Sequence, residues 1–283
     1  MLTRRSLIAA GAALMPGAAL AQTNALGALA ASTGGRLGLA VYDTGTGRRL
    51  HLDPTGRYSL CSTVKLPLVA AILKRVDAGE LSLAQMVRFG AADLLDHAPV
   101  ARAAVAAGQL SLERLCAAAV VDSDNTAANL LFPQIGGPRG LTRFLRECGD
   151  GVTRSDRDEP TLNAVRGGEQ RDTTTPAAMI GLMEALLVGD TVLSAASRAR
   201  LIGWMAQSTT GGRRLRAGLP QGWRAGDKTG TSGEGYVNDV AIVTPPGRRP
   251  ILIAAYLDAP GLAAERAEAA HARLGALIGQ LFA

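Results

Sequence analysis

Ser62 and Lys65 stand three residues apart at the start of a segment whose apolar side chains recur at helical spacing as far as Ala78. Because residues i and i+3 lie on one face of a helix, this spacing predicts that the lysine amine lies beside the serine hydroxyl. A serine becomes a nucleophile when a neighbouring base takes its proton, and the free N–H groups of a helix N-terminus can hold an oxyanion. The pair predicts a nucleophilic Ser62, although an N-cap serine and a surface lysine would give the same pattern.

Two further groups have residue types that could assist such a serine. Ser123-Asp124-Asn125 comes just before a predicted helix, where these residue types also serve as ordinary N-caps. Lys228-Thr229-Gly230 falls in a predicted strand, where a lysine and a hydroxyl suit an anionic carboxylate and a glycine permits close approach of a ligand. The alternative for this group is an edge strand that a lysine protects from pairing.

Lysine is rare in this chain, because only Lys65, Lys74 and Lys228 are lysines among its 30 basic residues. An arginine stays protonated near neutral pH, whereas a buried lysine can give up its proton. A lysine retained against this background is therefore a candidate for chemistry, and two of the three lie in the groups above.

The surrounding pattern indicates the elements that position these groups. Alternating apolar residues predict a β-hairpin from 36–42 and 48–52, and further strands over 223–231, 236–243 and 250–257. Helical spacing predicts helices over 62–78, 112–121, 125–132, 138–147, 176–187, 194–206 and 260–281. The periodicity is lost between Arg154 and Thr175, which predicts a long ordered loop of a type that is uncommon unless functional.

The order of elements is strands, then helices, then strands and a final helix, without the βαβ alternation of a doubly wound parallel sheet. We therefore predict an α/β fold of the α+β sandwich type, with a five-stranded antiparallel sheet from both chain ends, flanking helices and an inserted all-α domain. The predicted α/β domain covers 22–60 and 207–283. The predicted all-α domain covers 61–206 and includes the loop at 154–175.

The composition of the 283 residues is that of an ordinary globular protein, with 47% hydrophobic and 19% charged residues. The net charge of +6 comes from scattered basic residues, and only 4% of the chain is aromatic, so we expect no nucleic-acid partner. We expect a small-molecule substrate and a monomer.

Residues 1–21 predict a cleaved export signal. Arg4 and Arg5 precede an apolar run that is too short to span a membrane, and Ala19-Leu20-Ala21 is a small-x-small cleavage site. The paired arginines predict the twin-arginine type, with an ordinary Sec signal as the alternative. We expect a periplasmic or secreted protein with no stable membrane anchor.

Cys61, Cys116 and Cys148 are an odd number of cysteines for an exported protein, so at least one is free or pairs between chains. Neither the cysteines nor the three histidines have the spacing of a metal site. We expect no metal and no cofactor.

Taken in order, the motifs S-x-x-K, S-D-N and K-T-G resemble the set found in class A serine β-lactamases and penicillin-binding proteins. The element Glu159-Pro160-Thr161-Leu162-Asn163 is similar to the class A sequence E-x-x-L-N, and it falls inside the long loop as the family's Ω-loop requires. Arg157 and Asp172 resemble the pair that ties the ends of that loop. Similar runs cover nearly the whole mature chain, among them 125–131, 135–138 and 171–179.

The resemblance implies a hydrolase that opens the lactam amide of penicillins and cephalosporins and so confers antibiotic resistance, with carbapenem hydrolysis left open. It implies that Ser62 attacks the carbonyl and that Lys65, or Glu159 through a water, takes the serine proton. Backbone N–H groups of Ser62 and Thr231 would form the oxyanion hole. Ser123 would protonate the departing ring nitrogen.

In the same family, Glu159 with Asn163 would hold the water that hydrolyses the acyl-enzyme. Asn125 would bind the side-chain amide of the substrate. The residues implied for its carboxylate are Lys228, Thr229 and Thr231.

Two further contacts follow from the resemblance. Many family members carry an arginine on the strand after K-T-G, where this chain has Val237. Arg214 fits the alternative of a guanidinium supplied before K-T-G, which would hold a carboxylate bidentately, unless it is merely one of several surface arginines at 213–216. His97 stands where the family has an aromatic residue at the mouth of the cleft.

Cys61, directly before the nucleophile, resembles the carbapenem-hydrolysing branch of the family. Three further residues agree with that branch: Thr210, Arg214 and Thr231. That branch pairs the cysteine with a second one after K-T-G-T, but this chain has Ser232 there, so the bridge cannot form. Cys116 likewise matches a family disulfide whose partner position is Val69 here, which leaves free cysteines packed as small apolar residues as the simplest expectation.

Three rival functions share part of this pattern. A penicillin-binding DD-peptidase would have the three motifs without a base like Glu159 and would stay acylated. A penicillin-sensing receptor domain would need a transmembrane anchor, and a serine glutaminase would share only S-x-x-K. The presence of E-x-x-L-N favours the β-lactamase.

Overall fold

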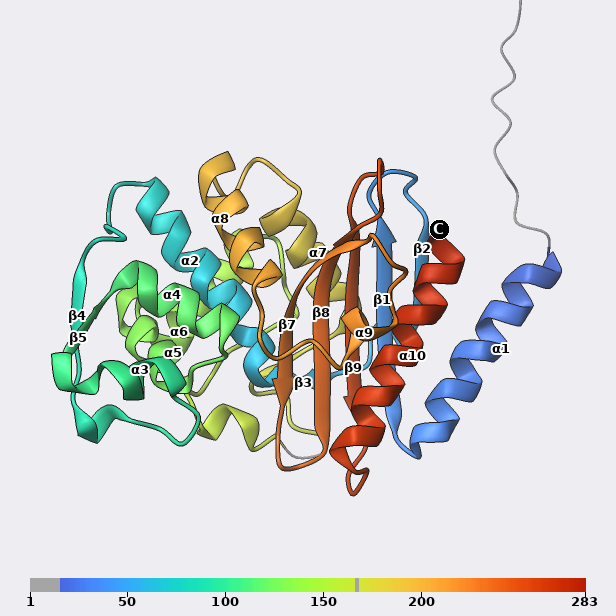
Figure 1. Ribbon diagram of the computed structural model, residues 1–283, viewed down its shortest axis with the longest axis horizontal. Helices are drawn as coiled ribbons and strands as arrows, with labels where there is room; N and C mark the ends of the chain where they lie inside the picture. The colour runs from blue at the N-terminus through green and yellow to red at the C-terminus, as the bar shows by residue number, and fades with distance from the viewer. Residues whose placement is uncertain (1–15, 166–167) are drawn as a thin grey trace, which may run out of the picture.

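The computed structural model describes residues 16–165 and 168–283 (Figure 1). Within these residues the main sheet has five antiparallel strands in the order β2-β1-β9-β8-β7, so strands from both ends of the chain lie side by side, as the sequence predicts. The strands of this sheet are β1 (Arg36–Asp43), β2 (Arg49–Leu52), β7 (Arg224–Thr231), β8 (Tyr236–Thr244) and β9 (Ile251–Asp258).

Helices occupy most of the segment between β2 and β7. The helices are α1 (Pro16–Thr33), α2 (Lys65–Asp77), α3 (Pro99–Ala104), α4 (Leu112–Val121), α5 (Asn125–Leu131), α6 (Gly137–Glu147), α7 (Pro176–Leu187), α8 (Ala195–Ala206), α9 (Leu215–Gly218) and α10 (Ala264–Phe282). The 3₁₀ turns are η1 (Cys61–Val64), η2 (Ala91–Asp93), η3 (Val105–Ala107), η4 (Phe132–Ile135) and η5 (Thr161–Asn163). Two short ladders join β3 (Tyr58–Ser59) to β6 (Thr173–Thr174) and β4 (Met86–Arg88) to β5 (Gln109–Ser111).

Both faces of the sheet are covered. On one face α10, α9 and α1 lie against the strands, and Leu39, Ile253 and Leu274 belong to the core between them (Figure 1). On the other face α7 packs on β1 and β9, and Tyr256 of β9 belongs to the larger core that extends into the central helices. Double coverage explains why β9 is apolar as far as Leu257 rather than alternating, and why β8 is buried along almost all of its length even where Asn238 and Asp239 interrupt its apolar residues.

Most predicted elements are present, and their ends follow local capping chemistry. Thr175 caps α7 by accepting the Ala178 N–H at 3.2 Å, with Pro176 at the first helical position. The predicted helix over 62–78 is divided into η1 and α2, which begins at Lys65. The final helix begins at Ala264 rather than Pro260, because Gly261 adopts a φ of +79° that no α-helix contains.

The predicted leader lies largely outside the described residues, which begin at Pro16. Helix α1 starts there, continues past the expected cleavage point after Ala21, and contacts α10 and β1. Among the described residues, none of the helices combines the length and apolar character needed to cross a membrane.

Candidate active site

Ser62 lies in η1, at the point where the chain enters α2. Lys65 begins α2, and its Nζ lies 2.8 Å from the Ser62 Oγ, as the three-residue spacing predicts. The preceding residue, Cys61, has a φ of +44°, a left-handed conformation that is uncommon outside glycine. This turn holds the serine hydroxyl at a helix entrance beside a basic group.

The Lys65 amine is buried and surrounded by acceptors. Besides Ser62 it lies 2.8 Å from the Ser123 carbonyl oxygen, 2.5 Å from the Asn125 Oδ1 and 2.9 Å from the Glu159 Oε1. An ammonium has three protons to donate, so four close oxygen atoms exceed its capacity. Burial lowers the pKa of Lys65, and the Glu159 carboxylate opposes that shift. The amine is thereby placed to exchange a proton with either neighbour.

The Ser123-Asp124-Asn125 group both caps a helix and contributes side chains to the site. Asp124 caps α5 by accepting the Ala127 N–H at 2.8 Å, and its other oxygen accepts the N–H groups of Val100 and Ala101 at 3.0 and 2.9 Å. This double cap fixes the loop in which Ser123 adopts a φ of +58°. The interpretation as an N-cap therefore holds for Asp124, and the cap is what positions Ser123.

Lys228 of β7 approaches Ser123 from the opposite side of the cleft. Its buried Nζ lies 3.0 Å from the Ser123 Oγ and 2.9 Å from the Thr229 carbonyl oxygen. Burial and the nearby positive charge of Lys65 together lower the pKa of Lys228 to about 7. Ser123 thus lies between two buried lysines whose pKa values are both lowered, with Lys65 Nζ at 3.4 Å.

Glu159 enters the site from the predicted long loop. The side-chain amide of Asn129 clamps its backbone, donating to the Glu159 carbonyl at 2.8 Å and accepting its N–H at 2.9 Å. The peptide bond from Glu159 to Pro160 is cis. Asn163 donates to the Glu159 Oε2 at 2.6 Å, which leaves Oε1 to face Lys65 and, at 3.4 Å, the Ser62 Oγ.

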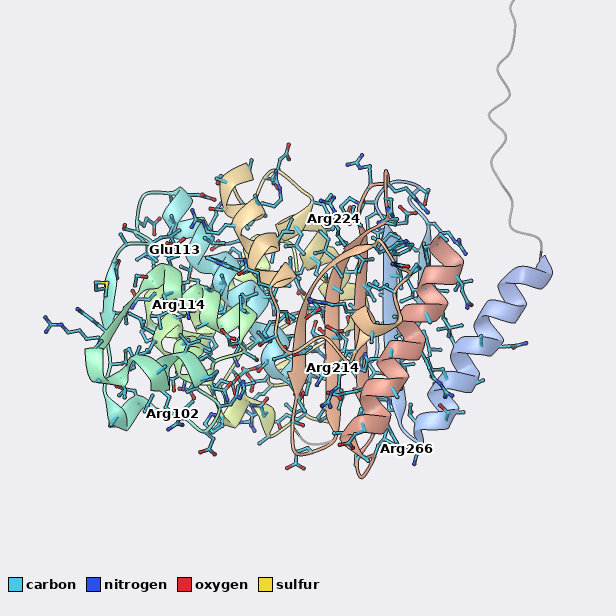
Figure 2. The ribbon with its side chains drawn as sticks, in the orientation of Figure 1. Arg102, Glu113, Arg114, Arg214, Arg224 and Arg266 are labelled. Carbon is cyan, nitrogen blue, oxygen red and sulfur yellow. The ribbon has the colours of Figure 1, made fainter. Side chains whose placement is uncertain are left out.

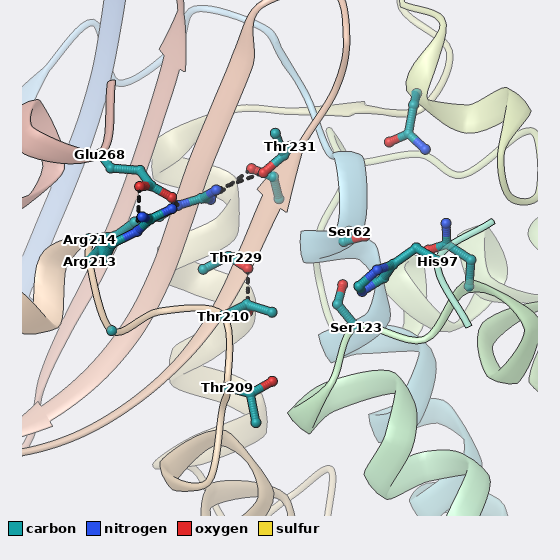
Figure 3. A pocket seen from close by; sticks show the side chains of 14 residues that line it. Ser62, His97, Ser123, Thr209, Thr210, Arg213, Arg214, Thr229, Thr231 and Glu268 are labelled. Carbon is teal, nitrogen blue, oxygen red and sulfur yellow. Dashed lines mark hydrogen bonds and ion pairs between the residues drawn. The ribbon is translucent and has the colours of Figure 1, made fainter. Parts of the chain in front are cut away.

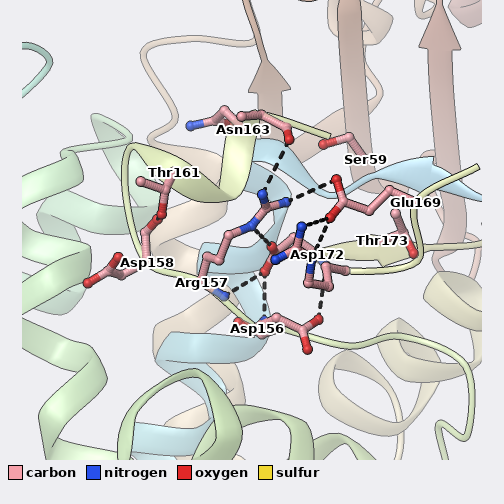
Figure 4. Close-up of polar contacts among 12 residues, drawn as sticks. Ser59, Asp156, Arg157, Asp158, Thr161, Asn163, Glu169, Asp172 and Thr173 are labelled. Carbon is pink, nitrogen blue, oxygen red and sulfur yellow. Dashed lines mark hydrogen bonds and ion pairs between the residues drawn. The ribbon is translucent and has the colours of Figure 1, made fainter. Parts of the chain in front are cut away.

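The ends of this loop are tied by the predicted ion pair (Figure 4). Arg157 Nε lies 2.6 Å from the Asp172 Oδ2, and the Asp172 Oδ1 accepts the N–H groups of Asp156 and Arg157 at 2.7 and 3.0 Å. Glu169 adds a weaker contact to Arg157 at 3.7 Å. The predicted pairing of Arg157 with Asp172 is confirmed. Residues 166 and 167 of the loop lie outside the described residues.

A cleft of about 570 Å³ lies between β7 and the helical segment (Figure 3). Its lining includes many of the predicted site residues and several that the sequence did not single out. The lining residues are Ser62, His97, Ser123, Asn125, Asn163, Thr209, Thr210, Gly212, Arg213, Arg214, Thr229, Gly230, Thr231 and Glu268.

The open edge of β7 forms one wall of the cleft. The residue opposite Thr231 on β8 is Val237. The adjacent pair, Ser232 with Tyr236, is hydrogen-bonded, because the Ser232 N–H donates to the Tyr236 carbonyl at 3.0 Å. Hydrogen-bonded and non-hydrogen-bonded pairs alternate along an antiparallel ladder, so the Thr231 N–H points away from β8 towards the open edge. The sheet register itself therefore leaves this donor available in the cleft.

Gly230 brings β7 close to the serine turn. A β-carbon at this position would lie 3.0 Å from both the Cys61 Cβ and the Leu60 carbonyl oxygen. The close approach that the glycine permits is therefore between β7 and the turn before Ser62, whereas the sequence predicted an approach by a ligand.

Arg214 is a buried residue of the cleft wall, so its interpretation as a surface arginine is wrong. One guanidinium nitrogen donates to the carbonyl oxygens of Gly230 and Asn238 at 2.9 and 2.7 Å, and the other donates to the Thr231 Oγ1 at 2.7 Å. Figure 2 shows Arg214 in the sheet half of the molecule near α10, far from arginines of the helical half such as Arg102. The neighbouring Arg213 is the exposed one, with its side chain 76% accessible.

His97 lies across the cleft from β7 (Figure 3). Its Nε2 lies 2.9 Å from the Asp122 carbonyl oxygen, and its own carbonyl oxygen accepts the Asn125 N–H at 2.8 Å. The ring therefore lies at the cleft wall and is anchored to the loop that carries Ser123.

Two cleft residues, Thr209 and Glu268, had no signal in the sequence. Thr209 lies beside Thr210, a residue noted for its agreement with the carbapenem-hydrolysing branch, which lies 2.6 Å from the Thr229 Oγ1 (Figure 3). Glu268 reaches the cleft from α10, where it contacts Arg213 at 2.8 Å and Arg214 at 3.9 Å. Only the fold brings this acid to the cleft, because it belongs to the last helix.

All three cysteines are free thiols in the structure. Cys61 is buried, its Sγ lies 3.4 Å from the Ser59 Oγ, and burial raises the pKa of its thiol to about 12. Cys116 is buried in the larger core, which also contains Val69. No group of three or more potential metal-ligand side chains occurs among residues 16–165 and 168–283.

Comparison with known proteins agrees with this geometry. The family model described as the β-lactamase enzyme family matches residues 21–282. The chain is 42% identical to β-lactamase L2 of Stenotrophomonas maltophilia over 265 residues, which are 93% of this chain and 87% of that protein. It is 41% identical to β-lactamase CTX-M-8 of Citrobacter amalonaticus, with 85% of this chain and 82% of that protein covered.

Solved structures show the same relationship. An ancestral class A β-lactamase superposes with a TM-score of 0.90 at 48% identity, covering 92% of this chain and all of that one. A β-lactamase of Xanthomonas campestris also has a TM-score of 0.90, at 47% identity, covering 93% of this chain and 98% of that one. With the serine, the two lysines and the loop glutamate in one cleft, the chain belongs to the class A serine β-lactamase family.

Proposed function

We propose that this β-lactamase hydrolyses the lactam amide of penicillins and cephalosporins through an acyl-enzyme on Ser62. One observation carries the proposal: the buried Lys65 amine lies between the Ser62 hydroxyl at 2.8 Å and the Glu159 carboxylate at 2.9 Å. A serine needs a base for attack, and a water needs a base for deacylation. This arrangement supplies both at one centre.

Acylation begins with attack of the Ser62 Oγ on the lactam carbonyl carbon, and the serine proton passes to neutral Lys65. We favour Lys65 over Glu159 as the acceptor, because Lys65 lies closer to the hydroxyl, at 2.8 Å against 3.4 Å for Glu159. Burial, which lowers the pKa of Lys65, supports the same choice. The N–H groups of Ser62 and Thr231 stabilise the oxyanion that forms.

The carbon–nitrogen bond of the ring then breaks, and the nitrogen takes the Ser123 hydroxyl proton. Ser123 is reprotonated by Lys65, which holds the proton taken from Ser62 and lies 3.4 Å from the Ser123 Oγ. Lys228, at 3.0 Å from the same oxygen, polarises the hydroxyl. The net result is the transfer of one proton from the nucleophile to the leaving group, with Lys65 and Ser123 returned to their starting states.

Deacylation depends on Glu159. Its carboxylate takes a proton from a water, whose oxygen attacks the ester carbonyl, and the proton returns to the Ser62 Oγ as the ester bond breaks. Asn163, which donates to the Glu159 Oε2 at 2.6 Å, fixes the carboxylate and offers its amide to the same water. A penicillin-binding peptidase lacks such a base and would stop at the ester.

The cleft wall provides the contacts for the substrate. The substrate carboxylate binds at the open edge of β7, where it accepts hydrogen bonds from Thr229, Thr231 and Lys228. Arg214 adds positive charge beside Thr231. Asn125 faces the opposite part of the cleft for the side-chain amide, and His97 lies at the wall beyond it. Carbapenems are a further candidate class to be measured in parallel.

We also propose that residues 1–21 direct export to the periplasm or medium and that the mature enzyme acts as a monomer. The apolar run after Arg4 and Arg5 and the site after Ala21 support export. Mass determination of the exported protein, and its elution volume on gel filtration, test these two points. An uncleaved cytoplasmic product or a stable dimer would contradict them.

Purified protein mixed with an excess of nitrocefin tests the reaction. We expect colour change to continue over many equivalents, and Ser62→Ala to abolish it while its fold, checked by circular dichroism, is retained. A single burst of one equivalent would instead indicate a penicillin-binding protein. Rates with benzylpenicillin, a cephalosporin and a carbapenem then define the substrate range.

A further inference from the structure

Two buried acids behind the open edge of β7 have no part in the proposed chemistry. Asp227 of β7 and Asp239 of β8 are 1% and 0% exposed. Asp227 is opposite Ala241 and Thr229 is opposite Asp239, so the two acids are diagonal neighbours on one face of the sheet. The Cβ atoms of such diagonal neighbours are about 7–8 Å apart or somewhat less, and both acids turn towards the same segment, residues 215 and 216.

Both acids bind the same short segment through one oxygen each. The Asp239 Oδ2 accepts the Leu215 N–H at 3.2 Å, and the Asp227 Oδ2 accepts the Arg216 Nε at 2.9 Å. The Oδ1 atoms of both acids are buried without a hydrogen-bond partner. Two ionised carboxylates, each with an unpaired oxygen in the interior, are an unfavourable arrangement.

One proton relieves this arrangement, because a protonated carboxyl gains an O–H donor that a neighbouring carboxylate can accept. We propose that Asp227 and Asp239 share a single proton and act as a positioning dyad for the segment that carries Arg214. The inference rests on the proposed function in assigning Arg214 to the substrate carboxylate.

The segment links the dyad to the cleft. Arg214 immediately precedes the two residues that the acids bind, and its guanidinium spans β7 and β8 before it reaches Thr231 (Figure 3). Loss of the acceptor for Leu215 would release the start of α9, and Arg214 would lose its fixed position beside Thr231.

Other charged and titratable groups surround the dyad. Arg214 and Arg216 of the bound segment lie on its side of the sheet. Glu268 and His271 of α10 act on Arg214. The register places Lys228 of β7 and Tyr256 of β9 on the opposite face of the sheet, from which they still interact electrostatically with Asp239. Burial and the charge of Asp227 raise the pKa of Asp239 to about 8, and Arg214 and Lys228 oppose the shift. Above this pH the dyad becomes two anions that repel one another, so the segment loosens as pH rises.

Variants of Asp239 separate a proton-sharing role from simple packing. Asp239→Asn keeps an N–H donor towards Asp227 and an acceptor towards Leu215, so we expect near-normal KM for benzylpenicillin at pH 7 and no rise in KM at alkaline pH. Asp239→Ala removes the acceptor, and we expect KM to rise about tenfold with a smaller change in kcat. KM for benzylpenicillin methyl ester, which has no carboxylate, should be unchanged in both.

The matched control is Asp258→Asn, which neutralises a carboxyl at the end of β9 that contacts Arg36 at 3.9 Å and does not contact the Arg214 segment. This control should keep the wild-type alkaline rise in KM. If Asp239→Asn raises KM as much as Asp239→Ala does, the positioning role by a shared proton is overturned.

A spectroscopic readout tests the proton without any substrate. Carbon-13 NMR of protein labelled at aspartate side chains should show one buried carboxyl that is protonated at pH 7 and titrates near 8, and the signal should be absent in Asp239→Asn. Two fully ionised buried acids at pH 7 would overturn the dyad. This measurement stands even if the protein hydrolyses no β-lactam, so failure of the proposed function remains distinguishable from failure of this inference.

Discussion

Removal of Asp172 should weaken the loop that carries Glu159 much more than its small side chain suggests. The carboxylate accepts three hydrogen bonds at 2.6 to 3.0 Å, one of them from the Arg157 guanidinium, and it is almost fully buried. Breaking one side of a buried ion pair costs about 3–5 kcal/mol, and the remaining contact of Arg157 with Glu169 places Asp172→Ala at the lower end, about 3 kcal/mol. Asp172→Asn keeps an acceptor for the two backbone N–H groups and tolerates the φ of +54°, so its cost should be about 1–2 kcal/mol.

Urea unfolding of the two variants measures these costs, with Glu80→Ala as a control. Glu80 forms an exposed ion pair with Arg75, which should contribute less than about 1 kcal/mol. Stopped-flow kinetics should show that deacylation slows more than acylation in Asp172→Ala, because Ser62 and Lys65 are held by α2 rather than by the loop. Equal unfolding free energies for Asp172→Ala and Glu80→Ala, or equal slowing of both steps, would refute this reasoning.

Two further predictions concern buried groups. Burial lowers the pKa of His271 from 6.5 to about 4, so the unfolded chain binds a proton first as pH falls from about 6.5 to about 4, and the fold loses about 3 kcal/mol over that window. Urea unfolding at a series of pH values should show this loss in the wild type and not in His271→Phe; the same acid sensitivity in both would contradict it. Cys61 and Cys116 are buried with raised pKa values, so a thiol reagent at pH 7 should modify at most the half-buried Cys148 in native protein and all three cysteines in denaturant. Rapid labelling of Cys61 in the native state would contradict its placement.

Local spacing was sufficient to predict the parts of the site that depend on one element. The three-residue interval between Ser62 and Lys65 places the amine beside the hydroxyl in any helical turn, and the N-cap preference of Asp124 fixes the loop before α5. The order of elements also predicted one antiparallel sheet built from both chain ends, whereas the pairing of β1 with β9 within it is seen only in the structure.

Contacts between distant elements could not be predicted in this way. Arg213 and Arg214 are adjacent arginines that the local sequence does not distinguish. Only the packing around α9, β7 and β8 buries Arg214 and leaves Arg213 exposed. Glu268 lies on an amphipathic helix whose rotation relative to the cleft is set by core packing. Asp239 interrupts an apolar strand and belongs to no motif. Its proposed role as a partner of Asp227 depends on the β7–β8 register, which places the two acids diagonally on one face.

The most direct test of the account is the intact mass of Glu159→Gln after mixing with benzylpenicillin. Glutamine keeps the size of Glu159 and cannot act as a base, while Lys65 remains beside Ser62 to promote acylation. We predict that the variant gains the mass of one penicillin on Ser62 and keeps it long after the wild type has returned to its free mass. Undiminished turnover by Glu159→Gln, or no added mass on Ser62 in either protein, would contradict the account.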